Sequence, residues 1–394
     1  MTHGITIFQV CVDVIGDDQP CNPFTEVLIL QHHTDIVRHL LLLDDKRCVS
    51  AGDDGLAIIW DYQIWEVDTG MCIKDITEHG SSVKCLMLIG DDMFVSGGHT
   101  LHLWSQYGKL LHTHTQKGEE ADVCIMMLTR HDRFVAAANK QLVVYQRKEI
   151  WRDEELSWQI SYVRALKHHS EAIRALTLVS DILFASGSID GTILLWSSQT
   201  FVPMVTLNSV KDYKGTNNFF PHSIQHLIVE SERYVVAAIG CGFSLFDIKT
   251  KKLICQKPCA HFSKIMHLSF VCDGSFLATC SEDGSIRLWG ARTYTPDTGQ
   301  EERANLATGV VNQFLNISPE QLRSRQGQLL PEPVLLGECL AHSGVVQKVI
   351  DCGQEGMFTC GDDGLVIGWK NSELQKLKRN QLLQEQVLDP SGVV

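Results

Sequence analysis

SEDGSIRLW, residues 281–289, recurs with small changes along the whole chain. Similar stretches are SAGDDGLAIIW (50–60), SGSIDGTILLW (186–196) and TCGDDGLVIGW (359–369). Each has a short apolar segment, an acidic residue followed by Gly, and alternating apolar residues that end on Trp. Asp-Gly favours two-residue turns, and the alternation is typical of a half-buried strand. Each stretch is therefore predicted to be a β-hairpin.

Three weaker copies without the acidic residue lie between these stretches: VSGGHTLHLW, VAAANKQLVVY and VAAIGCGFSLF. The aromatic residues that end the seven stretches are Trp60, Trp104, Tyr145, Trp196, Phe246, Trp289 and Trp369. Most of them are roughly 40 to 50 residues apart, and a repeat of about this length with four short strands is the signature of a propeller blade. The predicted fold is an all-β propeller with seven recognisable blades.

On these hairpins, residues 22–370 resemble the WD-repeat family. In that family a His before the blade, a Ser or Thr on the second strand, the turn Asp and the terminal Trp form a buried hydrogen-bonded network. Four blades keep this set: His33, Ser50, Asp54 and Trp60; His169, Ser186, Asp190 and Trp196; His261, Thr279, Asp283 and Trp289; His342, Thr359, Asp363 and Trp369. The resemblance implies that these residues are structural.

A relay of Ser, His and Asp could also indicate catalysis. Because the same trio recurs in four blades, however, a structural role is favoured, and no catalytic residue is assigned. The chain is predicted not to be an enzyme and to need no cofactor. The blades that end at Trp104, Tyr145 and Phe246 have no turn Asp, so packing is expected to hold them.

Composition restricts the partners of the chain. Its 394 residues carry a net charge of -13, which argues against nucleic acid as a partner because binding it requires clustered Lys and Arg. The 14 Cys include no C-x-x-C pair and favour a reducing compartment, so a cytoplasmic location is expected. Neither histidine doublet, His32-His33 or His168-His169, has metal-ligand spacing with Cys, and no metal is predicted.

The two ends of the chain are expected to differ from the blades. Residues 1–21 contain an apolar run too short to span a bilayer and interrupted by polar residues, so they are predicted to be a flexible leader without membrane insertion. FTEVLIL (24–30) belongs to no hairpin of its own. It is predicted to close the ring as the outer strand of the blade that ends at Trp369.

The first blade is unusual. Trp60-Asp61 is followed five residues later by Trp65-Glu66, and the sequence after Trp65 is typical of an outer strand. Five residues cannot hold the three strands that should separate two such Trp positions. One blade is therefore predicted to be missing between Asp61 and Trp65, and the parent architecture would have eight blades.

Two segments outside the hairpin pattern are candidate partner sites. A polar insertion at 290–333 lies within the last, 80-residue interval and contains an apolar island with Val310, Val311, Phe314 and Leu315. Residues 371–394 are predicted to form an amphipathic helix and tail, with Ser372 as N-cap. The apolar face of this helix would consist of Leu374, Leu377, Leu382 and Val387.

A narrower resemblance, to one group of WD-repeat proteins, rests on residues 21–60, on SSVKCLMLIGDDMFVSGG (81–98), and on SEDGSIRLW with its insertion and C-terminal helix. It implies a non-catalytic scaffold subunit in a complex with two longin-DENN proteins, the chromosome 9 open reading frame 72 protein and the Smith-Magenis candidate protein. Such a complex acts on small GTPases in autophagy and at lysosomes. The heterodimer would bind the chain ends, and a lysosomal membrane protein would bind the 290–333 loop.

Two other functions were weighed. A substrate receptor of a cullin ubiquitin ligase would need a W-D-x-R box, but residues 289–292 read Trp-Gly-Ala-Arg and lack the acidic residue. A propeller enzyme would need a polar cluster confined to one mouth of the channel, whereas the polar sets found in the sequence repeat from blade to blade. The scaffold subunit is therefore the preferred interpretation, with the cullin receptor as the alternative.

Overall fold

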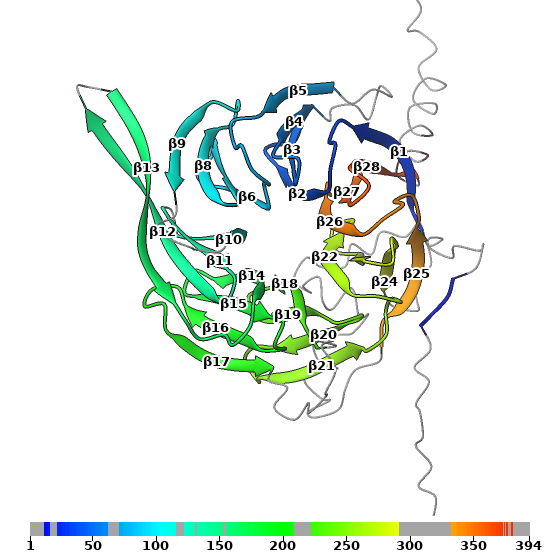
Figure 1. Ribbon diagram of the computed structural model, residues 1–394. Helices are drawn as coiled ribbons and strands as arrows, with labels where there is room; N and C mark the ends of the chain where they lie inside the picture. Colours follow the sequence, from blue (N-terminus) through cyan, green and yellow to red (C-terminus); the bar gives the residue numbers. More distant parts are fainter. Residues whose placement is uncertain are drawn as a thin grey trace, which may run out of the picture.

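The computed structural model describes residues 12–15, 22–61, 71–115, 122–130, 132–152, 155–208, 222–290 and 332–372, with 374, 376 and 380. Within them, 28 strands form seven four-stranded antiparallel sheets. Figure 1 shows the sheets arranged as blades around a central axis. The prediction of an all-β WD-repeat propeller with seven blades is confirmed.

The blades follow the chain in order. In blades 1 to 6 the strand nearest the axis comes first in the chain, whereas in blade 7 the nearest strand is β26 and β1 is the outermost (Figure 1). Blade 1 is β2 (Val37–Leu42), β3 (Arg47–Gly52), β4 (Ala57–Asp61) and β5 (Met71–Ile76). Blade 2 is β6 (Cys85–Leu88), β7 (Met93–Gly97), β8 (Thr100–Ser105) and β9 (Leu110–Thr115). Blade 3 is β10 (Val123–Arg130), β11 (Arg133–Ala138), β12 (Gln141–Arg152) and β13 (Glu155–Leu166). Blade 4 is β14 (Ile173–Ser180), β15 (Leu183–Ser188), β16 (Ile193–Ser197) and β17 (Pro203–Asn208).

The remaining blades complete the ring. Blade 5 is β18 (Ile224–Glu230), β19 (Tyr234–Ile239), β20 (Gly242–Asp247) and β21 (Lys252–Lys257). Blade 6 is β22 (Ile265–Val271), β23 (Phe276–Ser281), β24 (Ile286–Gly290) and β25 (Val334–Cys339). Blade 7 is β26 (Val346–Asp351), β27 (Gly356–Gly361), β28 (Leu365–Asn371) and β1 (Phe24–Gln31).

The hydrophobic core lies between neighbouring blades. Every residue of β23 is buried, because one face of blade 6 packs on blade 5 and the other on blade 7. Trp289 thus belongs to a cluster with Phe243 and Leu245 of blade 5, whereas Leu288 packs with Val346 and Met357 of blade 7. Strands buried on both faces have near-continuous apolar sequences, which is why the second and third strand of each blade dominate the sequence pattern.

The hairpin loops are longer than the sequence predicts. In blade 6, β23 ends at Ser281 and β24 begins at Ile286, so the loop has four residues, 282–285, and the predicted two-residue turn is wrong. Gly284 still adopts a positive φ of 82°, as the Gly of an Asp-Gly pair is expected to do. The extra length leaves the Asp283 side chain free to accept hydrogen bonds from its own loop and from the preceding loop.

The ring closes between the two ends of the chain. β1 pairs antiparallel with β28, from Phe24 opposite Asn371 to Gln31 opposite Leu365, as predicted for FTEVLIL. Without β1, the backbone N–H and C=O groups of β28 would form an open sheet edge, which favours pairing with other chains. The first described strand thus covers the last one.

The first blade is complete despite its unusual sequence. β5 pairs with β4, with Cys72 opposite Trp60 and Met71 opposite Asp61. Residues 62–70, which include the predicted position of the missing blade, lie outside the described residues. The eight-bladed parent stays a prediction.

The C-terminal segment begins as a helix. The backbone is helical at Ser372, Leu374, Lys376 and Asn380, the residues described beyond β28. The predicted N-cap, Ser372, is wrong, because the Oδ1 atom of Asn371 accepts a hydrogen bond of 3.1 Å from the Leu374 amide. Asn371 is thus the N-cap, and Ser372 instead donates from its amide and its hydroxyl to the carbonyl of Pro23. Among the described helical residues, none belongs to a helix long and apolar enough to cross a membrane.

Removal of residues 1–31 is expected to cause aggregation, because it deletes β1 and exposes the edge of β28. Size-exclusion chromatography with light scattering should show large oligomers for this variant. Removal of residues 1–11 should leave the protein monodisperse, since β1 remains. A monodisperse and equally stable variant without residues 1–31 would contradict the role assigned to β1.

Candidate functional site

The predicted network of blade 1 forms a continuous chain of hydrogen bonds. Nδ1 of His33 lies 2.7 Å from Oδ2 of Asp54, and its Nε2 lies 2.7 Å from Oγ of Ser50. Nε1 of Trp60 donates to the same Ser50 hydroxyl at 2.7 Å. The Asp54 side chain is only 4% exposed, and it also accepts from the amides of Thr34 and Leu56. The network thus ties the loop before the blade to the β3–β4 hairpin.

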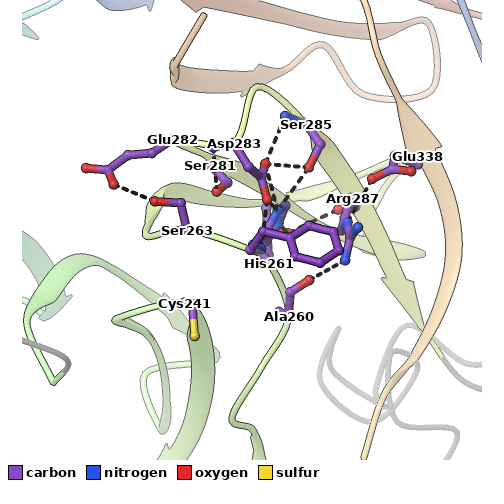
Figure 2. A network of polar contacts seen from close by, with 12 residues as sticks. Cys241, Ala260, His261, Ser263, Ser281, Glu282, Asp283, Ser285, Arg287 and Glu338 are labelled. Carbon is purple, nitrogen blue, oxygen red and sulfur yellow. Dashed lines mark hydrogen bonds and ion pairs between the residues drawn. The ribbon is translucent and has the colours of Figure 1, made fainter. Parts of the chain in front are cut away.

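Blade 6 repeats this arrangement and extends it (Figure 2). Nε2 of His261 lies 2.6 Å from Oγ1 of Thr279, and its Nδ1 lies 3.2 Å from Oδ2 of Asp283. Trp289 donates to Thr279 at 2.9 Å. Beside it, the buried Arg287 donates to Oε1 of Glu338 at 2.9 Å and to the carbonyl of Ala260 at 2.6 Å. This arginine joins β24 to β25 and to the loop before the blade.

Blade 7 has the same network, whereas blade 4 differs. In blade 7, His342 lies 2.9 Å from both Asp363 and Thr359, and Trp369 donates to Thr359. In blade 4, His169 contacts Ser186 at 2.6 Å, and Trp196 donates to the same hydroxyl at 2.7 Å.

Asp190 does not contact His169 directly in blade 4. Nδ1 of His169 lies 2.9 Å from Oγ1 of Thr192, which donates to Asp190 at 2.6 Å. A hydroxyl therefore stands between the imidazole and the carboxylate, an arrangement that the sequence analysis did not anticipate.

Burial and hydrogen bonding determine the charge states in these networks. Burial opposes ionisation of Asp283, but hydrogen bonds and charge attraction from His261, together with Ser285, outweigh it and hold the pKa of this carboxyl well below its usual range. Burial also lowers the pKa of His33, His169 and His261, more than their acidic neighbours raise it. The imidazoles are therefore neutral near pH 7 and can donate one N–H while accepting one hydrogen bond.

The blades without a turn Asp combine packing with fewer polar contacts. In blade 2, Trp104 still donates to Ser96 at 2.8 Å, a pair that the sequence analysis did not single out. His79 occupies the place of the blade His and contacts His102, with ring centroids 4.3 Å apart and ring planes tilted by 37°. In blade 3, Tyr145 stacks on Phe134 with their ring centroids 5.3 Å apart. Trp104, Tyr145 and Phe134 are buried among aliphatic side chains.

Most of the candidate partner residues cannot be placed. Leu374 is partly buried at the start of the C-terminal helix. The other predicted residues of the helix face and of the insertion lie outside the described residues: Leu377, Leu382, Val387, Val310, Val311, Phe314 and Leu315.

The first strands of six blades line a central cavity of about 980 Å³, and blade 2 contributes Ser82 and Lys84, which precede β6. Each of these six strands has a β-bulge, which directs two successive side chains to the same face. The bulges thus bring additional polar side chains to the cavity wall. In β2, for example, the pairing register shifts between Val37 and His39, and both Arg38 and His39 line the cavity. The same shift between Val346 and Lys348 in β26 brings Gln347 and Lys348 to the cavity.

On the outer surface, His32, Cys72 and Asp75 lie close together. His32 Nε2 is 3.0 Å from Asp75 Oδ2, and the Cys72 thiol donates to Asp75 Oδ1 at 3.0 Å. Within the described part of the chain, this is the one group whose potential metal-ligand atoms all lie within 4.8 Å of one another. Because the three side chains already satisfy one another and two of them are exposed, we assign no metal to this group.

The fold and the repeated networks define a seven-bladed WD-repeat propeller. A crystal structure of the WD40 β-propeller domain of Doa1 has the same fold, with a TM-score of 0.59 and 16% sequence identity, over 88% of this chain and 97% of that one. The profile of the WD domain, G-beta repeat, matches residues 24–61, and that of the WDR41 β-propeller family matches residues 62–379. The chain belongs to the WDR41 family.

Two relatives are similar over nearly the whole chain. WD repeat-containing protein 41 of Mus musculus is 28% identical over 443 residues, 96% of this chain and 94% of the mouse protein. The Homo sapiens protein of the same name is 28% identical over 446 residues, 95% and 94% of the two chains. These alignments are longer than the 394 residues of this chain, so the relatives contain positions without a counterpart in it.

Replacement of Asp283 by Ala is expected to lower the free energy of unfolding by about 1 to 3 kcal/mol, because it leaves His261 and the loop amides without their acceptor. Urea denaturation monitored by Trp fluorescence would measure this change. Asp91→Ala, at an exposed turn residue, is the matched control and should change stability little. Equal stability of the Asp283→Ala and Asp91→Ala variants would contradict the network's structural role.

Stability is expected to fall as the pH decreases from 7.5 to 5. The pKa values of His33, His169 and His261 are lower in the folded protein than in the unfolded chain, so the unfolded chain binds more protons in this window and is favoured by acid. Urea unfolding at pH 7.5, 6.5 and 5.5 should show a progressive decrease in the free energy of unfolding. A constant or rising value would show that these imidazoles are not held neutral by the fold.

Proposed function

We propose that this chain is the non-catalytic scaffold subunit of a complex with a longin-DENN heterodimer, formed by proteins of the chromosome 9 open reading frame 72 and Smith-Magenis candidate types. The complex would regulate small GTPases in autophagy, and this subunit would recruit it from the cytoplasm to lysosomes. Membership of the WDR41 family is the observation that carries the proposal. A propeller of this kind supplies rigid surfaces for protein partners. Its polar networks recur from blade to blade, which favours a structural role for them over a catalytic one.

The geometry of blade 7 supports a docking site at the chain ends. β1 is the outermost strand of that blade, and the helix that starts at Ser372 is attached to it through two hydrogen bonds to the Pro23 carbonyl. Asn371 fixes the first turn of the helix by capping Leu374. A partner that contacts the helix would therefore meet β1 as well, and both belong to a blade that is rigidly held by its neighbours.

Truncation after Asn371 is expected to abolish co-purification with the longin-DENN heterodimer while the propeller remains folded. The truncated chain lacks the predicted apolar face of the helix but keeps β28 and ring closure. A chain that ends at Asp389 is the matched control, because it loses the tail and keeps residues 372–388. Intact binding by the chain that ends at Asn371, with an unchanged melting temperature, would refute docking through the helix.

We assign lysosomal recruitment to the 290–333 insertion. Replacement of Phe314 and Leu315 by Ser should remove punctate lysosomal staining in starved cells, because the apolar island would lose its largest side chains. Ser replacements at the polar neighbours Asn312 and Gln313 should preserve the staining. The melting temperature and heterodimer binding should be unaffected in both variants. Persistent staining after the Phe314 and Leu315 replacements would place recruitment elsewhere.

A cullin receptor remains the second candidate from the sequence. The described structure adds no feature that favours it, since Trp289 donates its indole N–H to Thr279 inside blade 6 and is fully buried. Its ring is therefore part of the blade core. The scaffold role is the function that we put forward.

A further inference from the structure

The central channel contains a cluster of four basic side chains that no blade network uses. His226 of β18, His267 of β22, Lys348 of β26 and His39 of β2 come from four consecutive blades around the ring. They occupy the same position in their strands, directly after the bulge, and all four line the cavity. We call them the channel cluster.

Direct contacts hold the cluster together. The Lys348 ammonium group donates to Nε2 of His39 at 2.7 Å. The rings of His226 and His267 are in contact, with their centroids 3.8 Å apart and their planes tilted by 31°. Nδ1 of His267 is buried and has no hydrogen-bond partner among the described residues. Protein surrounds the cluster, yet the four side chains remain partly accessible from the cavity, so a small molecule in the channel can reach them.

Charge in the channel is positive, although the whole chain carries a net charge of -13. Five cationic side chains and two carboxylates line the cavity. Arg38 pairs with Asp53, Lys84 with Asp122 just outside the lining, and Lys264 with Glu282. Lys348 and Arg174 have no carboxylate partner among the described residues. An uncompensated ammonium group surrounded by protein is unfavourable, and a bound anion would compensate it.

We propose that the channel cluster binds a small phosphate-bearing anion. A phosphate group has several acceptor oxygens arranged around one atom, so it can accept hydrogen bonds from side chains that converge from four blades. Lysine is a common phosphate ligand because of its compact charge. A metal cation is disfavoured at the same place because the Lys348 ammonium group would repel it. The proposal is independent of the function proposed above.

The titratable groups around Lys348 make the binding pH-dependent. Burial lowers the pKa of Lys348 to about 8 and that of His226 to about 3, and burial together with Lys348 lowers the pKa of His39 and His267 well below the usual range.

Two thiols and three charged pairs complete the surroundings of Lys348. Behind it, burial raises the pKa of the Cys85 thiol and raises that of Cys360 to about 12, so both stay neutral. Arg38 with Asp53, Lys84 with Asp122, and Lys264 with Glu282 form three ion pairs in or beside the cavity lining. A bound anion would raise the histidine and lysine pKa values, so binding should take up protons and weaken as the pH rises through 8.

Isothermal titration calorimetry of the full chain with inorganic pyrophosphate, at constant ionic strength, tests this proposal. The wild-type protein should bind one pyrophosphate per chain, and the affinity should fall at least tenfold between pH 6.5 and pH 9. Lys348→Met should lower the affinity at least tenfold at pH 7. Lys252→Met, which removes an exposed lysine at the start of β21, should bind like the wild type.

A second measurement does not depend on the folding of a variant. An amine-reactive reagent at pH 8 should label Lys348 faster than exposed lysines, because its ammonium group loses its proton more easily. Pyrophosphate should protect Lys348 and leave the labelling of Lys252 unchanged, as mass spectrometry can determine.

A third measurement compares thermal stability without ligand. The Lys348→Met protein should melt at a higher temperature than the wild type, since an uncompensated charge is removed.

Three results would overturn the proposal. The first is the absence of pyrophosphate binding by the wild-type protein together with unprotected Lys348. The second is equal affinity of the Lys348→Met and Lys252→Met variants. The third is binding of a phosphoserine peptide without binding of pyrophosphate, which would assign the channel to a protein partner. Equal binding of sulfate and pyrophosphate would support the anion site and show that it accepts tetrahedral oxyanions in general.

Discussion

The pairing of β1 with β28 is the interaction on which the other features of this propeller depend. Each blade packs against two neighbours, so the core between blades is continuous only if the ring is closed. Closure is achieved by one antiparallel pair that joins residues more than 330 positions apart in the chain, Phe24 and Asn371 among them. The same strand pair holds the start of the C-terminal helix beside the first strand. It also fixes blade 7 next to blade 1, so that Lys348 of blade 7 meets His39 of blade 1 in the wall of the central channel.

Within this ring, the repeated networks connect the loop before a blade to the hairpin of the same blade. In blades 1, 6 and 7 an imidazole connects a carboxylate to a hydroxyl that also accepts the Trp indole N–H. Blade 4 reaches the same connection through Thr192. In these four blades both ring nitrogens of the blade His are hydrogen-bonded, whether the contact with the carboxylate is direct or passes through a hydroxyl.

Much of the fold could be predicted from the sequence because the features that define it are formed by residues close together in the chain. The Asp-Gly hairpins, the three weaker copies between them and the unpaired strand 24–30 are such features. Together they predict the blade number and the closing strand. The N-cap was missed because Asn371 is also the last residue of β28, so the strand pattern concealed it. The channel cluster could not be predicted, since its four members lie on four strands up to 309 positions apart and face the channel only because bulges change the alternation of the strands.

The central proposal is that blade 7, with its closing strand and its helix, is the rigid platform through which this chain would bind a longin-DENN heterodimer. Hydrogen–deuterium exchange of the full chain, alone and with the longin-DENN heterodimer, tests it most directly. The account predicts that peptides covering 24–31 and 365–371 are protected in the free protein about as strongly as those of the other blades. It further predicts that, of all the blades, blade 7 and the segment after Asn371 gain the most protection when the heterodimer is added. Rapid exchange of 24–31 in the free protein, or protection confined to blades on the opposite side of the ring, would contradict it.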